Sequence, residues 1–374
     1  MVTSDNVRRR KRRYIILVTL VVLVCGGWSA FWFYAAHQAQ QAIAGWKARE
    51  AAAGRDYTCG HQGLRGFPFR IEVDCSPAAA AFESGGTRLE VATRKALVVG
   101  QVYGHDLLIA ELTGPLTVGE PGKPAQMVVN WQSAVSSIGG NPIAPSRMAV
   151  AFDDPTIDRI EDGQKQPLLK ADHVEFHGRL VGGTVFDHPE IELALSLKHA
   201  LLPAVHALAT APLDGDIVAT LKGLKNFTPK PWAVRLHEIQ ANNGSIEINR
   251  LRLEQGPTLA IGKGTLRLDA QGLLNGKLDV TVAGLAPFLN AIGANVAVQN
   301  SPAMDKVAGF LDRLSPGLGD AARQQIGSHL SFGIKAIEGN ATLEGRPAVA
   351  LPLTVDKGAI SLGPVPLGQI PPLF

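Results

Sequence analysis

The N-terminal segment constrains the fold more than any other part of the chain. Six consecutive basic residues, Arg8–Arg13, lead directly into Tyr14–Ala36, a stretch without a charged side chain. As a helix, this stretch would span roughly 30 Å, the thickness of the hydrocarbon core of a bilayer. Basic flanks stay in the cytoplasm. The sequence therefore predicts a cytoplasmic tail over residues 1–13 and a transmembrane helix over 14–36 that carries the rest of the chain across.

The alternative is a cleaved signal peptide, with Ala42-Ile43-Ala44 as the cleavage site. The apolar part of a signal peptide usually runs about 7–15 residues, and the run here is longer. It also ends in aromatic residues that favour the membrane–water interface: Trp28, Phe31, Trp32, Phe33 and Tyr34. We therefore expect a retained anchor. Within it, Cys25 is expected to be an inert thiol, because the preceding Val24 does not suit lipoprotein processing.

The net charge of the remaining residues argues against one class of partner, and their composition indicates a β-rich fold. The basic tail contributes six positive charges and one negative charge to a formal net charge of +3, so the rest carries about −2. This balance argues against a nucleic-acid partner, which would need a basic face. With 40 Gly and 24 Pro among 374 residues, many turns and short strands are expected.

The two cysteines beyond the membrane segment, Cys59 and Cys75, are predicted to form a disulfide. An oxidising compartment favours the bond, and the intervening Gly66-Phe67-Pro68-Phe69 suits a hairpin turn. A redox or metal-binding pair is the alternative, although the spacing is not C-x-x-C.

Apolar residues alternate with polar ones over most of the chain beyond Gly54, which is typical of strands with one buried face. A linker helix is expected over 37–54, followed by an N-terminal β-rich domain over 55–225 and a C-terminal β-rich domain with helices over 226–374. The fold class is thus mainly β (α+β), with curved antiparallel sheets. Helices are predicted at Leu201–Leu208, Pro231–Gln240, Ala286–Ala297, Met304–Leu314 and Gly319–Leu330. The two halves share a loose pattern, and a duplicated domain remains an open alternative.

Two stretches resemble known families. Gly66-Phe67-Pro68-Phe69-Arg70-Ile71-Glu72-Val73, enclosed by Cys59 and Cys75, resembles an uncharacterised bacterial envelope family, as do Leu107–Val118 and the tail Leu362–Leu367. The strand pattern Gly264–Asp269, followed by Gly272 and Gly276-Lys277-Leu278, is similar to AsmA-like proteins. That likeness implies an inner-membrane anchor, a mostly β fold and a role in envelope biogenesis and lipid movement. The main domain would then be periplasmic and the N-terminus cytoplasmic.

Residues with catalytic or metal-binding chemistry are few. His173, Glu175 and His177 would share one strand face and have the ligand types for zinc or iron, but the same alternation turns Val174 and Phe176 toward the core, so a solvated face is favoured. Gly262-Lys263-Gly264-Thr265 lacks the spacing of a phosphate loop and is expected to be a turn. Trp131 and Trp232 could line a pocket, but a core position is favoured for each. No catalytic residue, metal site or cofactor is predicted.

Because no catalytic residue is predicted, we expect the protein to act by binding a ligand or a partner. The first hypothesis is a membrane-anchored protein that binds a lipid or another apolar ligand in envelope maintenance. Because the predicted helices fall mostly in the C-terminal half, the groove for an acyl chain is expected in the N-terminal sheet. The alternative is a structural or assembly partner of other envelope proteins, acting through sheet edges and the Pro-rich tail. An enzyme is not expected, since no nucleophile–base set is visible.

Overall fold

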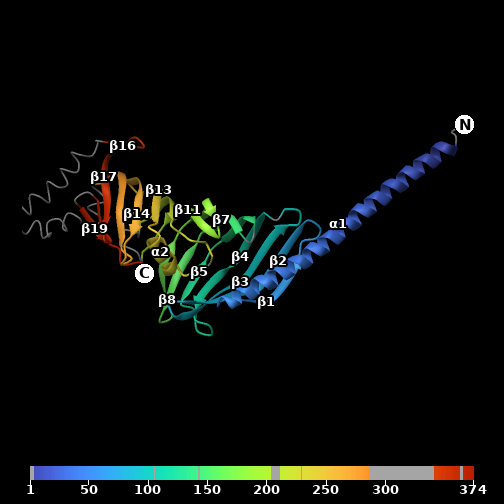
Figure 1. The fold of residues 1–374 in the computed structure, drawn as a ribbon, viewed down its shortest axis with the longest axis horizontal. Coiled ribbons are helices and arrows are strands. Elements are labelled where there is room, and N and C mark those ends of the chain that lie inside the picture. Colours follow the sequence, from blue (N-terminus) through green and yellow to red (C-terminus); the bar gives the residue numbers. More distant parts are fainter. Residues whose placement is uncertain are drawn as a thin grey trace, which may run out of the picture. The chain divides into compact units, whose positions relative to one another are not determined.

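The computed structural model describes residues 4–104, 106–141, 144–203, 211–228, 230–285, 341–362 and 365–374. In these residues the chain is mostly antiparallel β-sheet with two helices, and the sheet is open, which confirms the predicted fold class (Figure 1). The chain divides into two compact units, Met1–Gln126 with Val135–Pro142, and Met127–Ala134 with Ile143–Phe374. The domain boundary predicted at 225/226 stays a prediction.

One continuous helix, α1 (Ser4–Ala52), opens the first unit and includes both the predicted membrane segment and most of the linker helix. It is long and apolar enough to cross a membrane. From Trp28 onward, its less exposed positions recur every three or four residues, as expected for a helix with one face against other elements: Trp28, Trp32, Ala36, Ala39, Ile43, Lys47 and Glu50.

The strands of the first unit form an antiparallel sheet in the order β1-β2-β3-β4-β6. The strands are β1 (Asp56–Arg65), β2 (Arg70–Ser84), β3 (Thr87–Gln101), β4 (Leu107–Gly119) and β6 (Ser133–Asn141). Gly85 and Gly86, both at positive φ, join β2 to β3 in a two-residue turn, as such hairpins require. The helix packs on this sheet through a cluster of Trp32, Ala36 and Val102, with Leu64 and Ile71 beside it.

The second unit holds a larger antiparallel sheet in the order β7-β10-β11-β12-β13-β14-β15-β17-β18-β19. Its strands are β7 (Ala144–Asp153), β10 (His173–Thr184), β11 (Asp187–Ala200), β12 (Leu213–Lys222), β13 (Ser245–Gln255), β14 (Thr258–Leu268), β15 (Leu274–Ala283), β17 (Arg346–Asp356), β18 (Ala359–Leu362) and β19 (Val365–Gln369). The short β16 (Ala341–Leu343) pairs with β17. Strand β8 (Thr156–Glu161) lies between β5 (Met127–Asn130) and β9 (Gln164–Lys170) and pairs with both.

The predicted helix at Pro231–Gln240 is confirmed as α2 (Trp232–Ala241). The helices predicted at Ala286–Ala297, Met304–Leu314 and Gly319–Leu330 lie outside the described residues. So does most of Leu201–Leu208, in which Leu201 forms a β-bridge to Lys170 instead of entering a helix.

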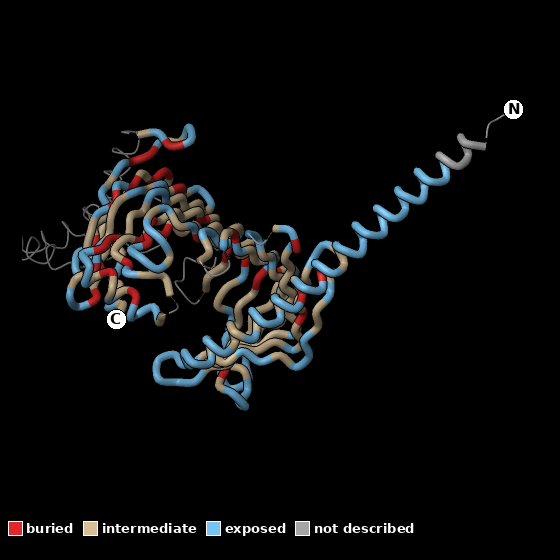
Figure 2. The backbone as a smooth tube through the Cα atoms, turned by 45° about the vertical axis from the view of Figure 1, so that its right-hand side comes forward, coloured by how far each residue is buried: buried red, intermediate tan, exposed pale blue. Residues whose placement is uncertain are grey.

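Buried residues concentrate in the second unit, whereas most residues of the first are half-buried or exposed (Figure 2). The largest cluster joins strands β15, β17 and β18 through Leu278, Val280, Val282, Leu285, Val349 and Leu362. The helix α2 adds Ile239 to a second cluster with Ile191, Leu221 and Leu224. These clusters make the second unit the better-packed part of the described chain.

Candidate functional site

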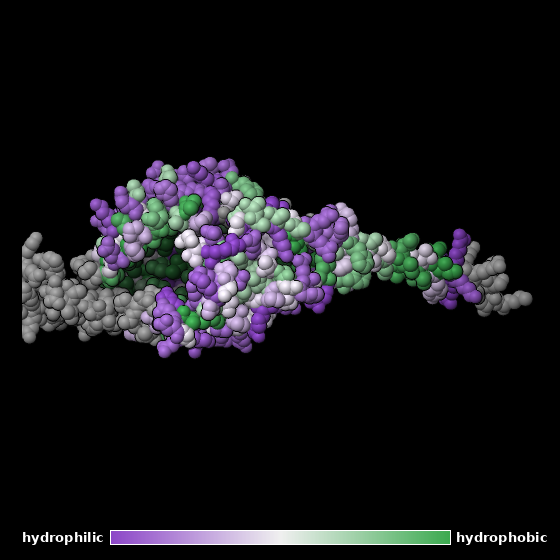
Figure 3. All heavy atoms as spheres, turned by 90° about the horizontal axis from the view of Figure 1, so that it is seen from below, coloured by the Kyte–Doolittle hydropathy of each residue, from purple (hydrophilic) through white to green (hydrophobic). Residues whose placement is uncertain are grey.

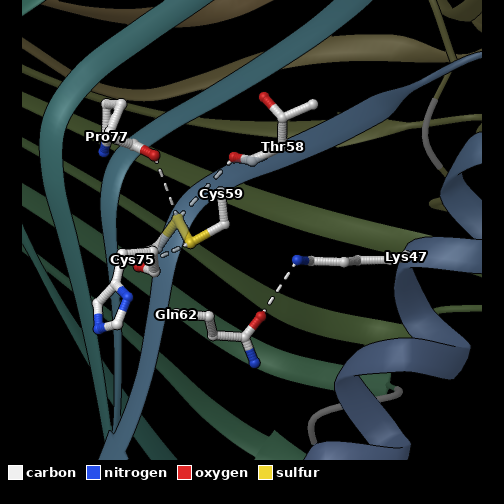
Figure 4. Close-up of a disulfide and its surroundings, with 7 residues drawn as sticks. Lys47, Thr58, Cys59, Gln62, Cys75 and Pro77 are labelled. Atoms are coloured by element: carbon white, nitrogen blue, oxygen red, sulfur yellow. Dashed lines mark hydrogen bonds between the residues drawn. A yellow bond between two sulfur atoms is a disulfide. The ribbon is translucent and has the colours of Figure 1, made fainter.

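A disulfide links the two strands of the β1–β2 hairpin, as predicted. Cys59 and Cys75 are bonded, with their Cα atoms 5.4 Å apart, which is ordinary for a disulfide. The two residues do not face one another in the ladder, since Cys59 pairs with Ala78 and Cys75 with Gln62. Figure 4 shows Lys47 of α1 reaching Gln62 beside the bond, with Nζ and Oε1 3.3 Å apart. The bond therefore lies where the helix meets the hairpin.

The tip of this hairpin is held by the aromatic end of the apolar helical run. The indole of Trp28 donates a hydrogen bond to the carbonyl of Pro68, and that of Trp32 to the carbonyl of Arg70, each 2.8 Å long. Phe67 packs edge-on against Trp32, with ring centroids 5.5 Å apart, and Phe69 lies 6.0 Å from Trp28. The predicted interfacial aromatics and the predicted hairpin thus form one cluster.

Further along α1, Trp46 packs on Tyr57 of β1, with ring centroids 4.5 Å apart. Partial burial, aided by the nearby Glu50, raises the pKa of Tyr57 above its usual value. Glu50 itself pairs with Arg55 at 2.6 Å. The helix therefore contacts the hairpin from the tip to the start of β1.

The second unit carries an apolar surface that crosses eight neighbouring strands of its sheet, from the edge strand β7 to β17. Directly paired residues of neighbouring strands share a face. One row of such pairs runs through Val150, Phe176, Leu195, Ile217, Leu251, Gly262, Val280 and Leu351. A second runs through Phe152, Val174, Leu197, Gly215, Leu253, Ala260, Val282 and Val349. A third runs through Met148, Gly178, Leu193, Ala219, Ile248, Gly264, Leu278 and Leu353. We call these three rows the apolar face.

The apolar face is better buried in strands β15 and β17 than in strands β10 to β12. At one end, Leu236 and Ile239 of α2 pack beside Ile246, and Phe374 of the tail packs beside Leu268. In strands β10, β11 and β12, the side chains of Phe176, Leu195 and Ile217 remain partly exposed in the described structure. Figure 3 shows a hollow lined by hydrophobic residues, with hydrophilic residues on its rims. The sequence predicted a groove within 55–225. The apolar face starts in that range, at β7, and continues past it.

The opposite face of the same sheet is polar. His173, Glu175 and His177 share it, as predicted, while Val174 and Phe176 lie on the apolar face. Glu175 contacts both imidazoles, with Oε1 2.9 Å from Nε2 of His177 and Oε2 3.8 Å from Nε2 of His173. Across the part of the chain that the structure describes, no group of three or more His, Cys, Asp or Glu side chains is arranged to hold a metal ion.

Ser133, Asp153 and His173 come together, although their order differs from that of a catalytic triad. Asp153 lies between the other two residues. One carboxylate oxygen accepts a hydrogen bond from the Ser133 hydroxyl at 2.5 Å, and the other is hydrogen-bonded to Nδ1 of His173 at 2.7 Å. A triad would place the imidazole beside the hydroxyl so that it could remove the proton. The bonds from Ser133 and His173 lower the pKa of Asp153. The arrangement stabilises a carboxylate and does not activate the serine.

The structure also shows where the glycine-rich stretch and the two tryptophans that were predicted to be structural lie. Gly262-Lys263-Gly264-Thr265 lies inside strand β14 and is paired on both sides, so the prediction of a turn there was wrong. Trp131 packs against Phe152 with ring centroids 5.5 Å apart, whereas Trp232 is 59% exposed at the start of α2, so the prediction of a core position for Trp232 was wrong. As the first residue of α2, Trp232 leaves its side chain largely in contact with solvent.

The helix α2 contains a buried charge that was not predicted from the sequence, Arg235. Arg235 is 4% exposed and donates hydrogen bonds to the carbonyls of Asn226 and Thr228, at 3.1 and 2.5 Å. Its guanidinium carbon also lies 4.6 Å from the centroid of the Phe227 ring. Burial lowers the pKa of Arg235 from its usual value. The spacing of Leu236 and Ile239 predicts an apolar face of the helix, but it does not indicate that the neighbouring Arg235 is buried.

Comparison with known proteins bears on the whole chain. No curated protein matches it. The profile of a family described as "Uncharacterized protein conserved in bacteria (DUF2125)" matches residues 32–371, which is most of the chain and includes the C-terminal half of α1. The likeness to AsmA-like proteins stays a prediction. The chain belongs to the DUF2125 family of bacterial proteins.

Proposed function

We propose that this protein is a single-pass inner-membrane protein whose periplasmic domain holds an acyl chain of a lipid on the apolar face of the second unit. The observation that carries the proposal is the apolar face itself. A sheet with one apolar face needs a helix, a second sheet or a ligand over it. The side chains of Phe176, Leu195 and Ile217 remain partly exposed on this face, whereas the residues that β15 contributes to it are buried. In the described residues, this surface consists of aliphatic and aromatic side chains with small residues between them, and such a surface suits a hydrocarbon chain.

The periplasmic placement rests on two independent features. The basic run Arg8–Arg13 directly before the apolar helical stretch favours a cytoplasmic N-terminus. The disulfide Cys59–Cys75 requires an oxidising compartment, which in bacteria lies outside the cytoplasm. Both support strands on the far side of the membrane.

Retention of the anchor is supported by the packing of α1. Cleavage at Ala42-Ile43-Ala44 would remove Trp32 and Ala36 from their cluster with Val102. It would also break both indole hydrogen bonds to the hairpin tip. The proposed role is binding and not catalysis, and it needs no cofactor.

Site-specific photocrosslinking would test the lipid. A photoreactive amino acid at Leu195 faces the proposed acyl chain, and the same amino acid at the neighbouring Ala194 faces the polar side of β11. In cells with radiolabelled phospholipid, we expect a labelled adduct from position 195 and none from 194. Crosslinks from 195 to peptides of the same chain, without lipid, would show that the chain covers its own apolar face and would overturn the proposal.

That outcome would favour the scaffold alternative, in which the protein holds other envelope proteins. The Pro-rich tail is a weak candidate for such contacts, because Leu373 and Phe374 pack with Leu268 and Leu274 in the second unit. A scaffold would therefore act through its sheet edges.

A further inference from the structure

The aromatic hairpin tip is fixed to the part of α1 that is apolar enough to lie in a membrane. Trp28 and Trp32 belong to the uncharged run Tyr14–Ala36, yet they bond to the carbonyls of Pro68 and Arg70 at the tip of the β1–β2 hairpin. Wherever these two indoles lie in the bilayer, the hairpin tip must lie beside them. The depth of the helix therefore sets the depth of the folded domain.

The depth of the helix follows from its basic end. Arg10–Arg13 cannot enter the hydrocarbon core without a large free-energy cost, so the core begins near Tyr14. At about 1.5 Å per residue, Trp28 lies about 21 Å and Trp32 about 27 Å beyond Tyr14. The hydrocarbon core is about 30 Å thick, so both indoles lie at or inside its far boundary. A tilt of the helix would draw them deeper, because each residue then crosses less of the thickness.

The side chains around the tip fit this depth. Phe67 is 53% exposed and Phe69 is 58% exposed, despite their ring contacts with the helix. Tyr103, which follows β3, is 61% exposed, and the neighbouring Val102 N–H donates to the carbonyl of Phe69 at 3.1 Å. Exposed aromatic side chains on two adjacent loops are costly in water but favoured at a membrane interface. Arg65 and Arg70, which flank the tip, are ion-paired with Asp74 and Glu72.

We propose that the tip of the β1–β2 hairpin, Gly66–Phe69, is immersed in the leaflet on the domain side of the membrane, with Phe67, Phe69 and Tyr103 in contact with lipid. The domain is then not held on a free tether but seated on the bilayer at one end of its first sheet. This inference rests on the anchoring part of the proposed function and does not need a ligand on the apolar face.

Spin-label accessibility in liposomes would test the immersion. The full chain, with Cys25→Ser and the disulfide intact, is labelled at Phe69→Cys or, separately, at Tyr103→Cys. Ser84→Cys is the matched control, because it lies at the far end of β2, up to about 45 Å along the strand. We expect labels at 69 and 103 to collide more with dissolved oxygen than with a water-soluble nickel chelate. The label at 84 should show the reverse.

A fourth label, at Val21→Cys, separates this inference from the anchor. If position 21 reads as buried in the membrane while 69 and 103 are as accessible to nickel as 84, the immersion is overturned and the anchor stands. If position 21 is itself accessible to nickel, the anchor fails and the immersion fails with it. Agreement between 69 and 103 guards against a local effect of replacing Phe69, whose ring contacts Trp28.

Discussion

At the residue scale, two polar side chains, those of Arg235 and Asp153, bind partners that the fold brings from other segments of the chain. Arg235 is buried with two carbonyl acceptors and an aromatic ring, and Asp153 gathers Ser133 and His173 on the polar face. Neither environment was visible in the sequence, because each depends on residues brought in from other segments. The outward position of His173 followed from the period-two alternation, but its bond to Asp153 required the register between β10 and β7.

Replacing Arg235 should destabilise the second unit. The Arg235→Met variant leaves the carbonyls of Asn226 and Thr228 without their donor, at a cost of about 1–3 kcal/mol. Thermal unfolding of the full chain in detergent should show a midpoint several degrees lower. Arg267→Met, at an exposed position of β14, is the control and should leave the midpoint nearly unchanged. Equal midpoints for the two variants would contradict the role given to Arg235.

The carboxylate of Asp153 should contribute to stability in a pH-dependent way. Its pKa is lowered in the folded chain, so its contribution is present above the ordinary carboxyl pKa near 3.8 and is lost as the pH falls through the lower folded value. The unfolding midpoint of Asp153→Asn should therefore fall below that of the wild type at pH 6, and the gap should close toward pH 3. Asp162→Asn, in the exposed Asp162-Gly163 turn, should show no such closing gap.

At the element scale, several strands are longer than the short strands predicted from the Gly and Pro content, because Gly and Pro also lie inside strands. Pro77 lies inside β2 and Pro115 inside β4. The ladder omits both residues, resuming at Ala78 and Leu116, since proline has no N–H to donate. A proline at such an irregularity does not end the strand. Strands β8 and β9 were missed, although Asp162-Gly163 between them is a strong hairpin signal.

The Cys59–Cys75 bond should stabilise the hairpin substantially. The cysteines are 16 residues apart, and closing a loop of that size contributes about 3 kcal/mol in the chain-entropy model. The double variant Cys59→Ser/Cys75→Ser should unfold at a lower temperature than the wild type, and reductant should lower the wild-type midpoint toward the same value. Cys25→Ser, outside the bond, should have no effect in either condition.

The docking of α1 on the hairpin should depend on Trp32. Trp32→Ala removes a buried indole and its hydrogen bond to Arg70, so amide hydrogens of the β1–β2 hairpin should exchange faster. Tyr34→Ala removes a side chain that is 62% exposed and should leave the exchange unchanged. Unaltered exchange in both variants would mean that the hairpin is stable without the helix.

At the scale of the whole molecule, the sequence predicted the β-rich class and the apolar helix because both depend on local periodicity and length. It could not predict the apolar face, which exists only once the register aligns Phe176, Leu195 and Ile217 across three strands. Nor could it predict that Trp28 and Trp32 hold the hairpin, since that contact joins segments 38 to 40 residues apart. Both features depend on pairing between distant residues, which a periodic pattern does not specify.

The uncleaved anchor is the prediction on which both the proposed function and the immersed hairpin depend. A signal peptidase that cut near Gly45 would remove the N-terminal basic run. It would also remove Trp32 and Ala36, which pack with Val102. The protein isolated from bacterial membranes should therefore have the intact mass of the full chain, and a periplasm-dependent reporter fused after Phe374 should be active. Replacing Arg8–Arg13 with neutral residues should weaken the orientation signal and reduce that activity. A mature N-terminus near Gly45, with the protein released from the membrane, would contradict both the anchor and the immersed hairpin.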